Sequence, residues 1–307
     1  MKKLLLFGLV TVFICSCGGS GTSDPAKENK KLTAIKQKSS TNLNISILLD
    51  LSDRIDTIKY SNPSMEYYRR DVGYLISVAK TFSDITSNKL TRKLNDKIQL
   101  YFDPEPMSSE INDLSNKLKF NITKDKGNGT LEYLDNISNE YATYGLSIYK
   151  QALKDDNYVG SDTWGFFKNK VKDYCVEEGY RNILVILTDG YVYYKNNLLT
   201  QDNFSTYITP QTIRSKRLNQ SNWKEIIKTK KHGFIPLDLD LSNLEILVLG
   251  INSVKNGNNK YDYDVLEKYW SDWIYGMGVK KENFAFKTAA LPSNMNNIIK
   301  SFISKKN

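Results

Sequence analysis

Short apolar runs alternate with stretches of helical periodicity along most of this chain. The apolar runs cover residues 45–50, 98–103, 120–123, 182–188, 244–251 and 284–288. Between them, apolar residues three and four positions apart mark helix faces that begin at Val72, Trp164, Val265 and Met295. This alternation predicts an α/β fold, a Rossmann-like, doubly wound and mostly parallel central sheet with helices on both faces.

Two of the runs, 183–187 and 246–249, contain consecutive rather than alternating apolar residues. Strands buried on both faces have this pattern, so we expect these two in the middle of the sheet. The passage between them, 191–236, is far longer than an ordinary connection in such folds. It predicts a small subdomain or a long loop inserted between the fourth and fifth strands. A tyrosine-rich stretch that ends near Tyr149 has a helical pattern.

The first 16 residues have the features of an export signal. Lys2 and Lys3 precede the apolar run Leu4–Ile14, which is too short to span a membrane. Ile14–Cys17 resembles a bacterial lipobox, which implies cleavage after residue 16 and acylation of Cys17. Cleavage by the ordinary signal peptidase and an uncleaved anchor are the alternatives. Residues 17–42 are rich in small and polar residues and predict a flexible tether, which leaves 43–307 as one folded domain.

The composition excludes several kinds of site. Only three cysteines occur, two of them within the first 17 residues, so neither a disulfide framework nor a cysteine-based zinc site can be assembled. The single histidine, His232, lies in a lysine-rich run, which predicts a solvated loop residue. The formal net charge of +9 comes without an arginine-rich stripe or a nucleic-acid-binding motif, so we expect no nucleic-acid partner.

An aspartate follows the first strand and another follows the fourth. The first lies in Asp50-Leu51-Ser52 and the second in Thr188-Asp189-Gly190. In a doubly wound sheet these two strands are neighbours, and the crevice where the winding reverses lies outside their carboxyl ends. We therefore expect Asp50 and Asp189 to meet there. Two carboxylates and the hydroxyl of Ser52 are the oxygen ligands that hard divalent cations prefer.

These two motifs resemble the metal-ion-dependent adhesion site of von Willebrand factor A (vWA) and integrin inserted domains. The similarity in element order extends from residue 44 to residue 303. The resemblance implies a further ligand, a threonine in a loop before the fourth strand. The segment Gly160–Trp164 is similar to that loop, with Ser161 in the place of the threonine and Thr163 as the neighbouring alternative. Thr130 is a third candidate, and capping of the following helix is the alternative role.

One residue departs from the family motif, because Arg54 stands where the motif has its second serine. A guanidinium cannot ligate a cation and carries a permanent positive charge. Two alternatives follow. Either Arg54 turns away and pairs with a carboxylate such as Asp53, or the site is weakened or metal-free.

The resemblance implies binding rather than catalysis. A bound Mg²⁺, Mn²⁺ or Ca²⁺ would accept an acidic residue of a protein partner, and we expect partner contacts from Arg54, Asp162, Tyr191 and Tyr193. With the lipobox, this predicts a lipid-anchored cell-envelope protein with an adhesion or assembly role and no enzymatic activity. The outer membrane is favoured, because Gly18 and Gly19 do not resemble an inner-membrane retention signal.

Two other functions remain open from the sequence. One is a metal-dependent phosphoester hydrolase with Asp50 as nucleophile, although Asp50-Leu51-Ser52-Asp53 lacks the second carboxylate at the spacing that such enzymes use. The other is a metal-free envelope scaffold in which Arg54 occupies the crevice.

Overall fold

The structure is a computed structural model that describes residues 41–155, 158, 160–252 and 260–305. The chain divides into two units, Met1–Lys38 and Ser39–Asn307, and the description below concerns the second. The predictions for the signal segment, for Cys17 and for the tether up to residue 40 lie outside the described residues. Within the described ranges, no helix has the length and apolar character needed to cross a membrane.

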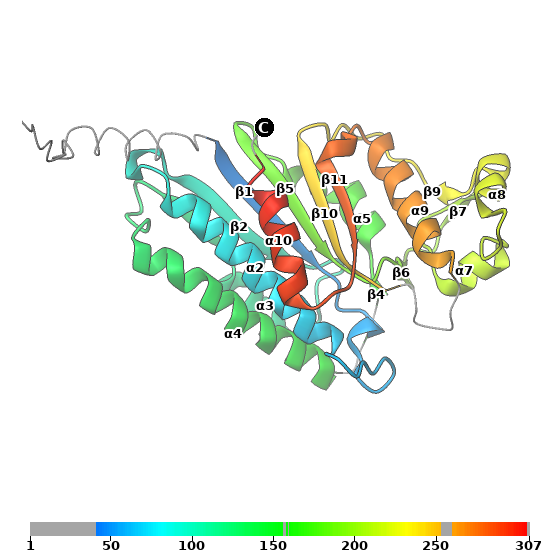
Figure 1. Cartoon of the computed structure of the whole chain (residues 1–307), viewed down its shortest axis with the longest axis horizontal. Helices are drawn as coiled ribbons and strands as arrows, with labels where there is room; N and C mark the ends of the chain where they lie inside the picture. The colour runs from blue at the N-terminus through cyan, green and yellow to red at the C-terminus, as the bar shows by residue number, and fades with distance from the viewer. Residues whose placement is uncertain (1–40, 156–157, 159, 253–259, 306–307) are drawn as a thin grey trace, which may run out of the picture. The chain divides into compact units, whose positions relative to one another are not determined.

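A six-stranded sheet forms the centre of this unit (Figure 1). Its strands lie in the order β11-β10-β5-β1-β2-β3, and only β3 runs antiparallel to its neighbour. The strands span Asn42–Leu49 (β1), Asn95–Tyr101 (β2), Phe120–Thr123 (β3), Tyr180–Leu187 (β5), Leu244–Ile251 (β10) and Phe284–Thr288 (β11). Each strand arises from one of the six apolar runs, so the predicted α/β class with a mostly parallel central sheet is confirmed.

Helices cover both faces of the sheet, and each face has its own core. The first core includes α2 (Tyr67–Ser87), α3 (Ser109–Lys117), α4 (Leu131–Asp155) and α10 (Pro292–Ile303), and the second includes α5 (Thr163–Asn169), α6 (Val171–Cys175) and α9 (Asp262–Gly276). Alternate residues of β5 enter different cores, Ile183 and Val185 the first and Leu184 and Ile186 the second. A strand buried on both faces therefore requires the continuous apolar run seen in the sequence.

One predicted helix differs from the structure. The helix face expected to begin at Trp164 is divided between α5 and α6, because Lys170 leaves helical geometry at φ −131°. Tyr174, on α6, is exposed and stacks on Tyr101 with ring centroids 5.0 Å apart. Stacking on a neighbouring ring thus covers one face of an aromatic residue that the core does not enclose.

The long passage between β5 and β10 has its own secondary structure. It contains β6 (Tyr193–Tyr194), β7 (Thr200–Gln201), β8 (Phe204–Ser205), α7 (Pro210–Ser215), α8 (Trp223–Lys230) and β9 (Gly233–Phe234). β7, β8 and β9 form a small sheet, whereas β6 pairs with β4 (Gly160–Ser161). Apolar side chains of the passage, including Ile213 and Phe234, belong to the second core. The passage therefore packs against the α9 side of the sheet.

Candidate functional site

The carboxyl ends of β1 and β5 meet at one edge of the sheet. Leu49 lies beside Leu187 in the parallel register, and the sheet extends from this pair toward β2 on one side and toward β10 on the other. This is the switch point where open α/β sheets bind ligands. A cavity of about 790 Å³ opens there, and its lining includes Ser52, Asp189 and Arg214. We call this cavity the crevice.

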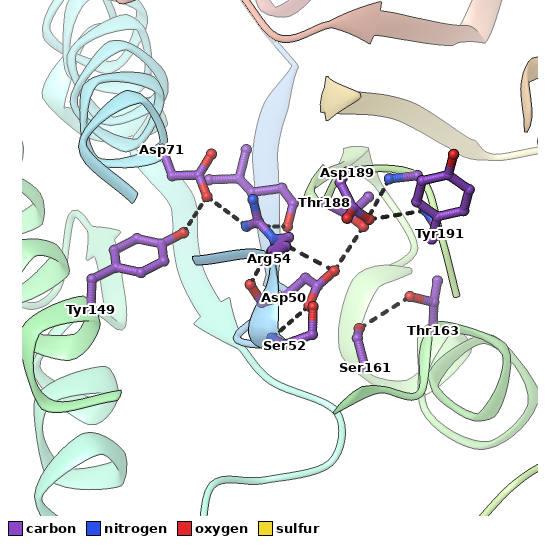
Figure 2. Close-up of polar contacts among 12 residues, drawn as sticks. Asp50, Ser52, Arg54, Asp71, Tyr149, Ser161, Thr163, Thr188, Asp189 and Tyr191 are labelled. Carbon is purple, nitrogen blue, oxygen red and sulfur yellow. Dashed lines mark hydrogen bonds and ion pairs between the residues drawn. The ribbon is translucent and has the colours of Figure 1, made fainter. Parts of the chain in front are cut away.

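The Asp50 carboxylate links the residues that follow the two strands by hydrogen bonds. It is buried, its Oδ1 accepts a hydrogen bond from the Ser52 N–H at 2.8 Å, and its Oδ2 accepts one from the Thr188 hydroxyl at 2.8 Å (Figure 2). Both oxygens thus already have partners in the chain. Asp50 lies behind Ser52 and is not among the residues that line the crevice.

Arg54 points inward, beneath the crevice. Its Nε donates to the Asp50 carbonyl at 3.0 Å and lies 3.5 Å from Asp50 Oδ2, while its Nη2 lies 2.5 Å from Asp71 Oδ2 and donates to the Leu187 carbonyl at 3.0 Å. Only 2% of its side chain is exposed. Burial alone lowers the pKa of Arg54, but the carboxylates of Asp71 and Asp50 outweigh it and hold the pKa above its ordinary value.

Two predictions about Arg54 need correction. It pairs with Asp71 rather than with Asp53, whose carboxylate instead contacts Lys59. It also has no exposed surface with which to contact a partner, because strands β1 and β5 and helix α2 enclose it.

Asp71 and Tyr149 are part of the site but were not among the residues predicted for it. Asp71 accepts a 2.7 Å hydrogen bond from the Tyr149 hydroxyl of α4 on the same oxygen that meets Arg54 (Figure 2). The signal was present, since Asp71 lies four residues before Leu75 and seven before Val78, on the apolar face of α2. A carboxylate on such a face needs a buried partner, and Arg54 is the partner here.

Asp189 occupies a turn that depends on glycine. Its Oδ1 accepts a hydrogen bond from the Tyr191 N–H at 3.0 Å, across Gly190, which has φ +95°. Only glycine adopts that conformation without strain. The Gly190 carbonyl accepts a hydrogen bond from Trp270 Nε1 of α9 at 2.9 Å, which fixes the turn. Thr188-Asp189-Gly190 thus directs Asp189 to the crevice while Thr188 holds Asp50.

Ser161 and Thr163 lie next to each other and both are buried, and Ser161 lines the crevice together with Asp189 (Figure 2). Their hydroxyl oxygens lie 3.4 Å apart. Asp162, between them, serves the chain itself: it caps α5 by accepting from the Gly165 N–H at 2.9 Å, and it accepts from Asn197 at 2.7 Å. The helix-capping alternative therefore holds for Asp162, while Ser161 lines the crevice.

Thr130 does not belong to this site. Its hydroxyl accepts a hydrogen bond from the Tyr133 N–H at the start of α4. Its neighbour Gly129 lies against Leu94, the residue before β2, so this turn is at the amino edge of the sheet. Thr130 is thus a helix cap at the edge opposite the crevice.

The predicted partner-contact residues differ in what they expose. Tyr193 lines the crevice and is half exposed, whereas Tyr191 lines it but is mostly buried. The Tyr191 hydroxyl lies 3.3 Å from Asp262 Oδ2, and burial together with that carboxylate raises the pKa of Tyr191. His232 contacts the Asn203 carbonyl at 3.2 Å and is not among the lining residues of the crevice.

The polar groups around the crevice carry oxygen atoms, which are the ligands that hard cations prefer. Ser52, Ser161 and Asp189 line it, and the Thr163 hydroxyl lies next to that of Ser161. Within the described ranges, no cluster of three or more His, Cys, Asp or Glu is arranged to hold a metal ion. A site that combines one or two carboxylates with hydroxyl groups differs from such a cluster. Its oxygen ligands are of the type that binds Mg²⁺ or Mn²⁺.

The chain was compared with family models, curated proteins and solved structures. No family model matches the chain, and no curated protein does either. The crystal structure of the pilus adhesin SpaC from Lactobacillus rhamnosus GG matches 87% of this chain at 10% identity, with a TM-score of 0.35. The chain spans 31% of the length of that adhesin chain.

Proposed function

We propose that this chain is a lipid-anchored cell-envelope protein that binds a protein partner through a divalent cation in the crevice. Its role is adhesion or assembly, without a catalytic step. The proposal includes a vWA-like domain in which 191–236 is an insertion between the fourth and fifth strands of the main sheet, β5 and β10. The observation that carries it is the convergence of Ser52, Ser161 and Asp189 on one cavity at the switch point.

Three separate segments contribute these oxygens. Ser52 follows β1, Ser161 belongs to β4, and Asp189 follows β5. Asp50 acts from behind, because its carboxylate holds the Ser52 backbone and the Thr188 hydroxyl in place. A bound Mg²⁺, Mn²⁺ or Ca²⁺ would supply an open coordination position for an acidic side chain of the partner.

The rim of the crevice has the composition of a contact surface. Tyr60, Tyr193 and Arg214 line it. Tyrosine and arginine are enriched at protein interfaces, and a guanidinium at the rim attracts a partner with an acidic residue. Arg214 and Tyr193 both come from 191–236, which gives that passage a role in partner choice.

The anchoring part of the proposal rests on the sequence around Cys17. In the described domain, β1 begins at Asn42, so the chain enters the sheet at the amino edge, whereas the crevice lies outside the carboxyl edge. A tether at Cys17 would therefore join the domain at the edge opposite its binding site. The outer membrane is the membrane that we favour.

A second candidate is a metal-free scaffold, favoured by the position of Arg54. Its guanidinium lies within 3.5 Å of Asp50 Oδ2 and 2.5 Å of Asp71 Oδ2, so a positive charge of the chain already faces these carboxylates. In that case the partner is held by Arg214 and the tyrosines of the rim, without a cation.

Capture of partners from envelope extract separates the two candidates. The bait is the full chain with Cys17→Ser, in Mg²⁺ or in EDTA, beside Asp189→Asn and a matched control, Asp272→Asn, which removes an exposed carboxylate paired with Lys268. We expect capture that requires Mg²⁺, disappears in Asp189→Asn and persists in Asp272→Asn. Capture that ignores EDTA and Asp189→Asn but disappears in Arg214→Gln would contradict the cation and support the metal-free scaffold.

A further inference from the structure

A second cavity, lined by apolar and polar residues, lies next to the crevice. Its volume is about 590 Å³, and its lining includes Leu51, Phe102, Pro106, Met107 and Ile111. It is formed by the ends of β1 and β2, the start of α3 and the last turns of α4. We call it the apolar pocket.

The apolar pocket and the crevice share a wall. Tyr158 and Gly160 line both. Gly160 has φ +96°, and a Cβ at this position would lie 2.2 Å from the Tyr193 carbonyl oxygen, so only glycine allows β4 and β6 to approach this closely. Because Tyr158 and Gly160 line both cavities, the two cavities adjoin at these residues.

The most exposed large apolar side chains of the described residues lie beside these two cavities. Ile58 is 94% exposed and immediately precedes Lys59 and Tyr60, which line the crevice, and Met107 is 88% exposed and lines the apolar pocket. Exposed apolar groups gathered around cavities are typical of binding surfaces. A methionine at a rim also adapts its shape to different ligands.

Acidic groups limit what the apolar pocket can accept. Asp103, Glu110 and Asp155 line it together with the apolar residues. Burial raises the pKa of Asp103 to about 6, so this carboxylate is ionised at neutral pH. An apolar ligand that carries its own carboxylate, such as a fatty acid, would be repelled. An uncharged apolar side chain meets no such repulsion.

We propose that the apolar pocket receives a large apolar side chain of the partner, from the same segment whose acidic residue enters the crevice. This inference rests on the proposed function. The partner motif is an acidic residue with Leu, Ile, Met or Phe within a few positions. The shared wall at Gly160 brings the two binding sites close enough for one extended segment to fill both.

Short labelled peptides test the proposal by fluorescence anisotropy with the Cys17→Ser chain in Mg²⁺. One set carries a central Glu and a Leu one, two or three positions before or after it, and a matched set carries Ala in place of Leu. We expect at least one Leu peptide to bind about tenfold more tightly than its Ala counterpart, the effect of burying one large aliphatic side chain. Met107→Ser should remove that advantage and leave the Ala peptide unchanged, because it removes apolar surface without adding a charge.

Two further variants make the outcomes distinguishable. Leu131→Ser is the control for Met107→Ser, because Leu131 is also exposed but starts α4 at the other edge of the sheet. Asp189→Asn should weaken Leu and Ala peptides alike. Equal binding of both sets, lost in Asp189→Asn, would overturn the apolar pocket while the proposed function stands. Binding of no peptide, or binding that Asp189→Asn leaves intact, would overturn both.

Discussion

The two edges of the central sheet both contain buried ion pairs, but the pairs are composed differently. At the amino edge, Lys89 Nζ lies 2.6 Å from Asp96 Oδ1, and Arg181 Nε lies 2.6 Å from Glu245 Oε1. Each pair joins one cation to one carboxylate. The cations also donate to main-chain carbonyls, Lys89 to the residue before β1 and Arg181 to the end of α10. These pairs therefore satisfy carbonyl groups next to the start of β1 and at the end of α10.

At the carboxyl edge one guanidinium faces two carboxylates. Arg54 contacts Asp71 and Asp50, and Asp189 lies at the same edge beside an open cavity. The carboxylate of Asp189 and the hydroxyls of Ser52 and Ser161 line this cavity, and hard cations prefer such oxygen ligands. The amino edge therefore has a structural role, whereas the carboxyl edge is suited to binding.

The largest effect is expected from Asp96→Asn at the amino edge. This change leaves the buried ammonium of Lys89 without its carboxylate, and breaking a buried pair in this way costs about 3–5 kcal/mol. Urea unfolding followed by circular dichroism measures the loss. Asp272→Asn, in an exposed pair with Lys268, is the control and should change the free energy of unfolding by less than about 1 kcal/mol. Equal losses in the two variants would contradict a structural role of the amino edge.

A smaller, pH-dependent effect is expected from Asp103→Asn near the carboxyl edge. Burial raises the pKa of Asp103 from 3.8 to about 6. The folded chain therefore binds this proton more tightly than the unfolded chain, and the stability it contributes is lost as the pH rises from about 4 through 6. Asparagine carries no charge, so the variant should be more stable than the original by about 1–2 kcal/mol at pH 8.

Below pH 4 this gain should vanish, because Asp103 is then protonated in the folded chain. Lys170 Nζ, which lies 3.3 Å from Asp103, is partly exposed and can turn to solvent in the variant. Thermal unfolding at pH 8 and at pH 4 measures both values. A gain of the same size at both pH values would show that the charge of Asp103 is not its cause.

The smallest effect on stability is expected from Asp50→Asn in EDTA. Asp71 remains next to Arg54, and the asparagine still accepts a hydrogen bond from Ser52, so the loss should be about 1 kcal/mol. The contrast with Asp96→Asn is the point of the comparison. A loss as large as that of Asp96→Asn would mean that Asp50 is the indispensable partner of Arg54, and the two edges would then be alike.

The positions of the strands could be predicted because each strand is a short apolar run, separated from the next by a stretch of different periodicity. The neighbouring positions of the two strand ends that precede Asp50 and Asp189 followed from the strand order alone, because parallel neighbours end at the same edge. Of the two carboxylates, only that of Asp189 lines the crevice. The direction of Arg54 could not be predicted in this way. It depends on Asp71, 17 residues away on α2, and on Tyr149 of α4, and the positions of both become known only when the helices pack.

In the passage 191–236, too, the contacts between distant segments could not be predicted from the sequence. Its length predicted a small subdomain or a long loop, but the pairing of Tyr193 with Ser161 joins segments that no local pattern connects. Gly160 was visible in the sequence as part of a loop. Its need for a positive φ and for close contact with the Tyr193 carbonyl appears only in three dimensions.

Direct titration of Mn²⁺ into the Cys17→Ser chain, by calorimetry and by the loss of the free-ion paramagnetic resonance signal, tests the cation in the crevice most directly. The account predicts one ion per chain, lost in Asp189→Asn and retained in Asp272→Asn, with a stabilisation of about 2.7 kcal/mol at a hundredfold excess over the Kd. No binding, or binding that Asp189→Asn leaves unchanged, would contradict it.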